Sequence, residues 1–129
     1  MRVLVVDGAN VTGSRPDGWW RDRAGAAARL HGELAATPLG YDEVVLVLEG
    51  KARAGRPAGP EGGVTTVHAP GSGDDTIVDV VRARVGAGAR DVVVVTADRG
   101  LRTRVSDAGG TSIGPSWLLE RLRPDGDPR

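Results

Sequence analysis

Runs of valine and leucine without alternating polar residues recur along the chain. They occupy residues 3–6, 41–48 and 92–95, and a shorter run covers residues 64–67. A strand buried on both faces shows this pattern, as in a parallel sheet covered by helices. A small strand at residues 111–113 completes the sheet that the pattern predicts.

Between these runs, apolar residues recur at helical spacing. The predicted helices cover residues 19–36, from 74 or 75 to 85, 98–106 and 115–122. We expect residues 11–17 to form a loop that ends on Asp17 as a helix N-cap. Residues 50–63 show periodicity of neither kind, so we expect a mobile surface loop there.

Strands and helices alternate throughout, which is typical of an open, mainly parallel sheet with helices on both faces. The predicted fold class is therefore a three-layer α/β/α arrangement. A chain of 129 residues suffices for one such domain. We expect this domain to span residues 1–122 and to be followed by a frayed tail at residues 123–129, which contains Pro, Gly and Asp.

Composition restricts the function classes only a little. The 17 basic residues balance the 17 acidic ones, so the net charge neither favours nor excludes a nucleic-acid partner. The absence of cysteine excludes disulfides and thiolate metal sites, and it fits a reducing cytoplasm. The first apolar run is too short for a signal peptide or a membrane span. We expect a cytoplasmic protein without a membrane partner, and we leave its oligomeric state open, a homodimer included.

Acidic residues follow the ends of the predicted strands. Asp7 follows the first strand, Glu49 the second and Asp98 the fourth, while Asp74 and Asp75 open a helix. The carboxyl ends of parallel strands lie at one edge of a sheet, where ligands bind. Carboxylates that converge there repel one another unless they are protonated or cations lie between them. Oxygen ligands favour Mg²⁺ or Mn²⁺, and such a site most often serves phosphate chemistry.

Each of these acids also has a structural explanation. An Asp at a helix start is a common cap, but two adjacent acids exceed what one cap requires. One of Asp74 and Asp75 is therefore expected to cap the helix, and at least one is expected to bind metal. Asp79 lies one helical turn beyond Asp75 and is either a further ligand or a surface acid. Glu49 stands near basic residues, so its charge is open to screening by solvent.

Polar and basic neighbours fit supporting roles. Asn10 is suited to hold Asp7 or a metal-bound water, and the hydroxyl of Thr96 to bond Asp98 or a phosphate oxygen. Either residue could equally stabilise a turn. The arginines predicted to contact an RNA backbone are Arg15, Arg99 and Arg102.

Two adjacent tryptophans, Trp19 and Trp20, lie among arginines. In an RNA-binding protein such rings stack on bases. A tryptophan in an Ala-rich amphipathic helix more often belongs to the core. We therefore assign Trp20 to packing and leave the role of Trp19 open.

Three motifs together resemble the PIN-like nucleases of the NYN group, particularly the bacterial YacP-like branch. They are VDGANV at residues 6–11, GDD at 73–75 and TADRGL at 96–101. The resemblance extends from residue 3 to about residue 119. It implies a Rossmann-like sheet of strand order 3-2-1-4-5 and metal-dependent endoribonuclease activity.

The resemblance also implies site residues. They are Asp7 with its Asn10, Asp75 or Asp74, and Asp98. At one position this chain departs from the family pattern, because YacP-like sequences tend to have Asp after the second strand where this chain has Glu49.

The sequence therefore predicts a ribonuclease that uses water activated by Mg²⁺ or Mn²⁺. The predicted metal ligands are Asp7, Asp74, Asp75, Asp79 and Asp98, and the predicted substrate contacts are Thr96, Arg15, Arg99 and Arg102. A non-catalytic RNA-binding or regulatory domain of the same fold and a small-nucleotide phosphohydrolase are the alternatives. An open acidic groove edged by arginine favours the nuclease, and a closed pocket with a base-stacking residue favours the phosphohydrolase.

Overall fold

A computed structural model describes residues 1–123 of the protein, and a six-stranded sheet forms its centre. The strands are β1 (Arg2–Asp7), β2 (Glu43–Leu48), β3 (Gly59–Glu61), β4 (Val64–His68), β5 (Asp91–Val95) and β6 (Thr111–Ile113). Their spatial order is β3-β4-β2-β1-β5-β6. The predicted order is confirmed for the five parallel strands β4-β2-β1-β5-β6, and β3 adds an antiparallel edge strand that the sequence did not predict.

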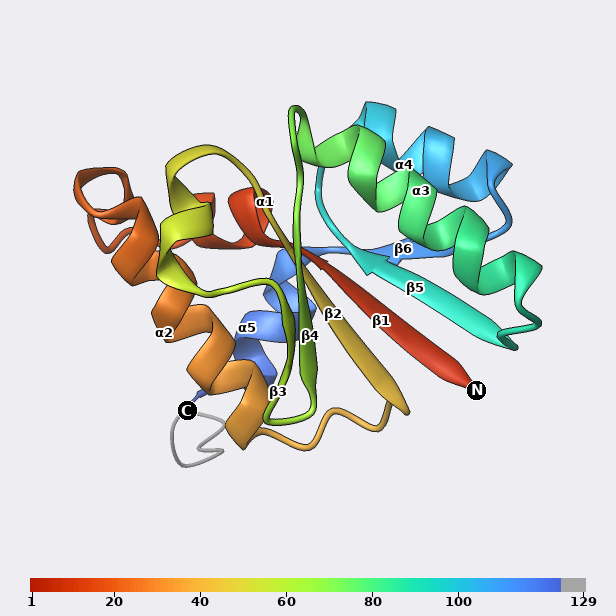
Figure 1. Ribbon diagram of the computed structural model, residues 1–129, viewed down its shortest axis with the longest axis horizontal. Helices are drawn as coiled ribbons and strands as arrows, with labels where there is room; N and C mark the ends of the chain where they lie inside the picture. The colour runs from red at the N-terminus through yellow and green to blue at the C-terminus, as the bar shows by residue number, and fades with distance from the viewer. Residues whose placement is uncertain (124–129) are drawn as a thin grey trace.

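Helices cover both faces of the sheet (Figure 1). The helices α2 (Arg23–Ala36) and α5 (Pro115–Arg121) lie on one face, and α3 (Gly73–Gly86) and α4 (Arg99–Asp107) lie on the other. A short helix α1 (Gly8–Gly13) follows β1, and two 3₁₀-helices, η1 (Trp19–Arg21) and η2 (Gly50–Gly55), lie in the connections. The predicted three-layer α/β/α fold is confirmed.

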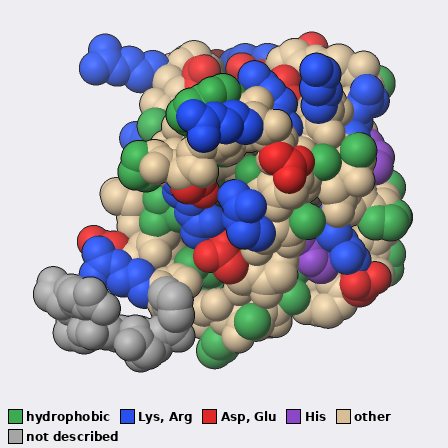
Figure 2. Space-filling model, turned by 90° about the vertical axis from the view of Figure 1, so that its left-hand side faces the viewer, with side chains coloured by type: hydrophobic (Ala, Val, Ile, Leu, Met, Phe, Trp, Pro, Cys, Tyr) green, Lys and Arg blue, Asp and Glu red, His purple; other side chains and the backbone are tan. Residues whose placement is uncertain are grey.

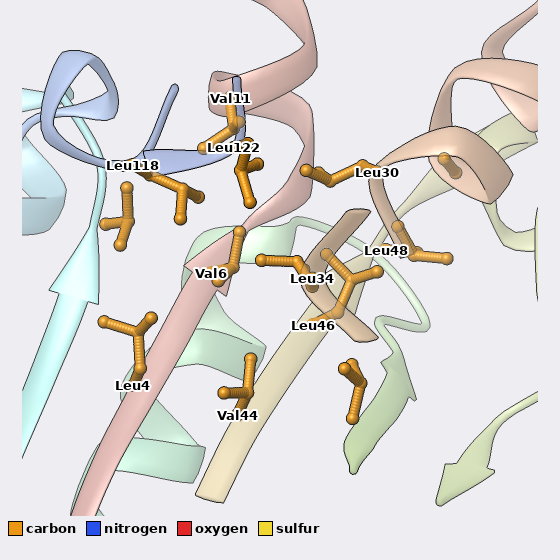
Figure 3. Packing of buried hydrophobic residues seen from close by; sticks show 13 residues of the cluster. Leu4, Val6, Val11, Leu30, Leu34, Val44, Leu46, Leu48, Leu118 and Leu122 are labelled. Carbon is orange, nitrogen blue, oxygen red and sulfur yellow. The ribbon is translucent and has the colours of Figure 1, made fainter. Parts of the chain in front are cut away.

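The central strand β1 explains why its apolar run has no polar alternation. Leu4 and Val6 belong to the core beneath α2 and α5, which Figure 3 shows from close by. Val3 and Val5 belong to the second core, beneath α3 and α4. All four side chains are completely buried. Because full burial of one such side chain stabilises the fold by roughly 1.5–3 kcal/mol, β1 is fixed firmly between its neighbours.

The carboxyl ends of the parallel strands meet at one edge of the sheet (Figure 1). The helices α1, α3 and α4 each begin at this edge, after β1, β4 and β5 respectively. Residues that close a strand or open one of these helices are therefore brought together. This is the edge where the sequence predicts the site.

The connection between β1 and α2 differs from its prediction. Part of the expected loop at residues 11–17 is helical, because α1 begins directly after β1 with the carboxylate of Asp7 as its N-cap. The long helix begins at Arg23 with Asp22, and not Asp17, as its N-cap. Asp7, which the sequence predicts as a metal ligand, thus also caps a helix.

Trp20 does not pack in the core. It is 55% exposed and lies in η1, before the first turn of α2. The prediction placed it in the apolar stripe of a helix that was assumed to begin four residues too early. Once the helix begins at Arg23, Trp20 no longer shares a face with Leu30 and Leu34, which are buried.

Most of residues 50–63 form regular structure, η2 and β3, instead of the expected loop. The 3₁₀-helix η2 packs on α2, and β3 pairs with β4. Gly55 permits this packing, because a Cβ at that position would lie 2.2 Å from the backbone oxygen of Ala24. Pro60 is tolerated because β3 is an edge strand, where a missing N–H donor costs little. Elements this short have no periodicity to detect.

The frayed tail expected at residues 123–129 lies outside the described residues, except for Arg123. Within residues 1–123, no helix combines the length and the apolar character that a membrane crossing requires.

Candidate active site at the carboxyl edge of the sheet

Asp7 is the buried centre of the candidate site. It is 5% exposed, at the junction of β1 and α1. Its Oδ1 accepts a hydrogen bond from the backbone N–H of Asn10 at 3.2 Å, and its Oδ2 accepts one from the hydroxyl of Thr96 at 2.9 Å. Because each carboxylate oxygen has its own donor, the orientation of the group is fixed.

Thr96 connects the ends of β1 and β5. Its hydroxyl is fully buried, donates to Asp7, and accepts from the backbone N–H of Asp98 at 3.2 Å. A second hydrogen bond connects the same two strand ends. The side-chain oxygen of Asn10 accepts it from the backbone N–H of Ala97 at 2.9 Å. The two strand ends are thus held together by two hydrogen-bonded bridges.

Asp98 is the N-cap of α4. Its Oδ1 accepts from the N–H of Leu101 at 2.8 Å, and the residue is exposed. Arg102, on the next turn of the same helix, donates from Nε to the backbone oxygen of Thr96 at 3.1 Å. Arg102 therefore supports the loop that carries Asp98, in addition to the substrate contact predicted for it.

Ser72 caps α3, so the prediction that Asp74 or Asp75 does so is wrong. The Ser72 hydroxyl accepts from the N–H of Asp74 at 3.2 Å. Asp75 is exposed, with an ion pair of 3.0 Å to Arg104 of α4. Asp74 is partly buried and is the carboxylate that interacts with the other acids of the site.

The pKa of Asp7 reflects this environment. Burial raises it above the ordinary value of 3.8, because removal from water penalises the charged form. The hydrogen bonds from Thr96 and Asn10 act in the opposite direction, and the negative charges of Asp74 and Glu49 raise the pKa further. Four separate segments therefore contribute to the electrostatics of one carboxylate.

The pKa of Asp74 is raised as well. Burial contributes most, and the charge of Asp98 adds to it, while Arg104 opposes the change. Asp7, Asp74 and Asp98 thus form a chain of repelling neighbours, with Asp74 in the middle. We call these three residues the acidic cluster.

Glu49 lies beside the acidic cluster. Its Oε1 is 2.6 Å from the position that a Cβ on Gly73 would occupy, so the side chain rests against the first residue of α3. Its charge also acts on Asp7. The longer side chain that departs from the family pattern therefore still brings a carboxylate to this edge.

Three predicted site residues form no hydrogen bond or ion pair with the acidic cluster in the part of the chain that the structure describes. Asp79 is exposed, and its charge is not among those that shift the pKa of Asp7 or Asp74. Arg15 forms a bidentate ion pair with Glu33 of α2, at 2.7 and 3.0 Å, which occupies its guanidinium. Arg99 is the exposed first residue of α4, and its side chain has no ion-pair partner within the described part of the chain.

The donors of the acidic cluster fit a divalent cation chemically. All are oxygens, and Mg²⁺ typically keeps several waters and is held by only one or two carboxylates. Within residues 1–123, no three His, Asp or Glu side chains are arranged closely enough to hold an ion directly. The binding of Mg²⁺ or Mn²⁺ therefore stays a prediction, and it requires water between the ion and part of the cluster.

The fold is that of the YacP-like proteins, as the motifs indicated. Two solved structures of Rae1 (YacP) from Bacillus subtilis, one of them a point variant, match this chain with a TM-score of 0.74 at 20% identity. The matches cover 95% of this chain and 75% and 74% of the Rae1 chains. No family model matches the sequence. No curated protein matches it either. At this identity the likeness establishes the fold alone.

Proposed function

We propose that this protein of YacP-like fold is a metal-dependent ribonuclease that hydrolyses RNA phosphodiester bonds at the acidic cluster. The observation that carries the proposal is the convergence of Asp7, Asp74 and Asp98, which come from three elements far apart in sequence. Burial of carboxylates and repulsion between them lower the stability of the fold, and such a cost is expected at a functional site. The resemblance of the three motifs to NYN nucleases supports the same assignment.

Each residue of the site has a defined role in this proposal. Asp7, Asp74 and Asp98 would hold the cation, which when bound supplies a water of lowered pKa and neutralises charge on the phosphate. Thr96 keeps the Asp7 carboxylate in one orientation, and Asn10 keeps the loops of the two strand ends together. Arg99, which follows Asp98 in the chain and is exposed, would contact a phosphate of the RNA backbone.

The decisive experiment compares Asp7→Asn with Asp79→Asn on single-stranded RNA, in Mg²⁺, in Mn²⁺ and in EDTA. We expect cleavage to require the divalent ion and to fall at least about 100-fold in Asp7→Asn. Asp79→Asn removes an exposed acid outside the cluster, and we expect it to keep the wild-type rate. Cleavage that persists in EDTA and in Asp7→Asn would contradict the proposal.

A folding defect does not explain the expected loss in Asp7→Asn. The raised pKa means that the ionised carboxylate is less favourable in the folded protein than in the unfolded chain. A neutral Asn of the same shape removes this penalty at neutral pH and can still accept one of the two hydrogen bonds. We expect its melting temperature to equal or exceed that of the wild type.

One observation favours a second candidate, a non-catalytic RNA-binding domain. The carboxylates in residues 1–123 do not form a ready-made set of metal ligands. In that case RNA would bind without being cleaved, and Asp7→Asn would bind it as tightly or more tightly, because repulsion of the phosphates is reduced. The binding of labelled RNA by both proteins, measured beside cleavage, separates the two candidates.

A further inference from the structure

A pocket of about 170 Å³ adjoins the acidic cluster. Its wall comes from α1, η1, the start of α2 and η2, and its lining side chains include Thr12, Trp19, Arg23, Glu49 and Lys51. Glu49 lines the pocket and also acts electrostatically on Asp7. The pocket and the acidic cluster are therefore neighbours, and one extended ligand can reach both.

Trp19 gives the pocket a flat aromatic surface. The guanidinium carbon of Arg23 lies 4.9 Å from the centre of the Trp19 ring, and the ring of Trp20 packs edge-on against it, with centres 6.1 Å apart at 87°. These contacts hold the ring in place, and Trp19 is only partly buried. Aromatic rings and guanidinium planes are the surfaces on which unpaired bases of single-stranded nucleic acids stack.

Two cationic side chains line the same pocket. Arg23 and Lys51 are both exposed, and within residues 1–123 neither has a carboxylate at ion-pair distance. This distinguishes them from Arg15 and Arg56, whose guanidinium groups are paired with Glu33 and Glu61. Unpaired cations beside an aromatic ring suit a ligand that has both a planar base and phosphates.

The volume restricts what the pocket holds. Sites for drug-sized molecules measure about 300–1,000 Å³. At about 170 Å³, this pocket is large enough for one heterocyclic ring system. The sugar and phosphates attached to such a ring must lie outside the pocket.

We propose that this pocket binds one unstacked base of a single-stranded RNA, with Trp19 as the stacking surface and Arg23 and Lys51 against the flanking phosphates. The inference rests on the proposed ribonuclease function and adds a subsite to it. Binding of this base places a neighbouring phosphodiester bond at the acidic cluster. The site of cleavage is then set by its distance from an accessible base, so double-stranded RNA is a poor substrate.

The experiment uses a short labelled oligoadenylate and a series of the same oligonucleotide with one abasic residue at successive positions. Cleavage is measured with Mn²⁺, and binding is measured in EDTA by fluorescence polarisation. We expect one abasic position to weaken wild-type binding about tenfold, which is within the range for the loss of one base stacked on an aromatic ring. The other positions should have little effect.

Variants of the two adjacent tryptophans give a matched comparison. Trp19→Leu should bind the intact oligonucleotide about tenfold more weakly and should no longer respond to the abasic position. Trp19→Phe keeps an aromatic face and should retain most of the affinity. Trp20→Leu removes an exposed ring that contacts Trp19 but does not line the pocket. It should weaken binding much less than Trp19→Leu does, and it should keep the response to the abasic position.

The inference is overturned if wild-type binding is indifferent to the abasic residue at every position, an outcome that needs no variant to fold. Equal effects of Trp19→Leu and Trp20→Leu also overturn it, as does hydrolysis of adenosine monophosphate in preference to the oligonucleotide. Abasic discrimination in binding without any cleavage supports the subsite and contradicts the ribonuclease. Cleavage without abasic discrimination contradicts the subsite and supports the ribonuclease.

Discussion

At the scale of single residues, Thr96 determines how the acidic cluster is built. Its buried hydroxyl serves Asp7 and the backbone of Asp98 at the same time, so one side chain fixes both strand ends. The sequence suggested a contact with Asp98 or with substrate. Thr96 is 0% exposed, which leaves no access for substrate and makes it a positioning residue.

Thr96→Val is expected to lower RNA cleavage about 10- to 100-fold, as the loss of groups that orient ligands typically does. It leaves an oxygen of Asp7 and the N–H of Asp98 without their partner, which costs about 1–3 kcal/mol of stability. Thr96→Ser keeps the hydroxyl and should restore most of the rate. Rate and urea unfolding should be measured for both variants, and equal rates for Val and Ser would contradict the positioning role.

His31 of α2 should make stability depend on pH. Burial lowers its pKa below the ordinary value of 6.5, the charge of Arg56 lowers it further, and Glu61 opposes this change. The unfolded chain therefore binds a proton at a pH where the folded protein does not. The contribution of neutral His31 to the free energy of unfolding is therefore complete above pH 6.5, and it is lost as the pH falls through the pKa of His31 in the folded protein.

His31→Leu should remove this dependence. The free energy of unfolding of the wild type, measured in urea at several values between pH 7.5 and 5, should fall more steeply than that of the variant. The side chain is buried, and its Nε2 has no hydrogen-bond partner within the described residues, so Leu loses no bond at that nitrogen and gives up only the contact with the backbone of Glu61. If the free energies of unfolding of the wild type and of His31→Leu change in parallel with pH, the pH dependence does not come from His31.

At the scale of elements, the packing of η2 on α2 turns an aperiodic segment into ordered structure. It brings Lys51 to the pocket beside Trp19 and Glu49. The close approach at Gly55 is what makes this packing possible. The side chains around the pocket therefore depend on one glycine outside it.

Gly55→Ala should destabilise the protein by about 1–3 kcal/mol, the range for overpacking, because the new Cβ meets backbone that cannot move aside. Gly32→Ala, on α2 with open space around it, is the matched control. It should stabilise by about 0.5–1 kcal/mol, because Ala is favoured over Gly inside a helix. Urea unfolding of both variants tests the pair, and a neutral Gly55→Ala would show that η2 does not pack closely on α2.

At the scale of the whole molecule, charge is balanced and mixed. The formal net charge is zero. Figure 2 shows Lys and Arg side chains interspersed with Asp and Glu side chains on the face at the α2 side. Long-range attraction therefore contributes little to RNA binding, and a few local cations must supply the electrostatic part.

RNA binding should accordingly depend only modestly on salt. With Arg23, Lys51 and Arg99 as phosphate contacts, the logarithm of the binding constant should fall against the logarithm of salt concentration with a slope of about −2, at roughly 0.7 per contact. Lys51→Ala should make the slope shallower by about 0.7. Titrations at several salt concentrations measure both slopes, and an unchanged slope in the variant would exclude Lys51 as a phosphate contact.

The sequence predicts the architecture and the edge of the sheet at which the candidate site lies. Apolar runs such as residues 3–6 and 92–95 identify strands buried on both faces, because such a strand requires apolar residues at consecutive positions. The residues that end such strands meet at the carboxyl edge whatever the details of packing. This reasoning places Asp7 and Asp98 at that edge, and the five parallel strands have the order that the family resemblance implies.

Which side chains from different elements meet depends on how the helices and strands pack. Adjacent residues such as Asp74 and Asp75 have the same local chemistry, but packing of α3 against α4 partly buries Asp74 and leaves Asp75 exposed in an ion pair with Arg104. The ordering of η2 and the exposure of Trp20 likewise depend on contacts between distant segments. The physical reason is that periodicity records whether a side chain is buried. Distances between charges and rings from different elements arise only when those elements pack.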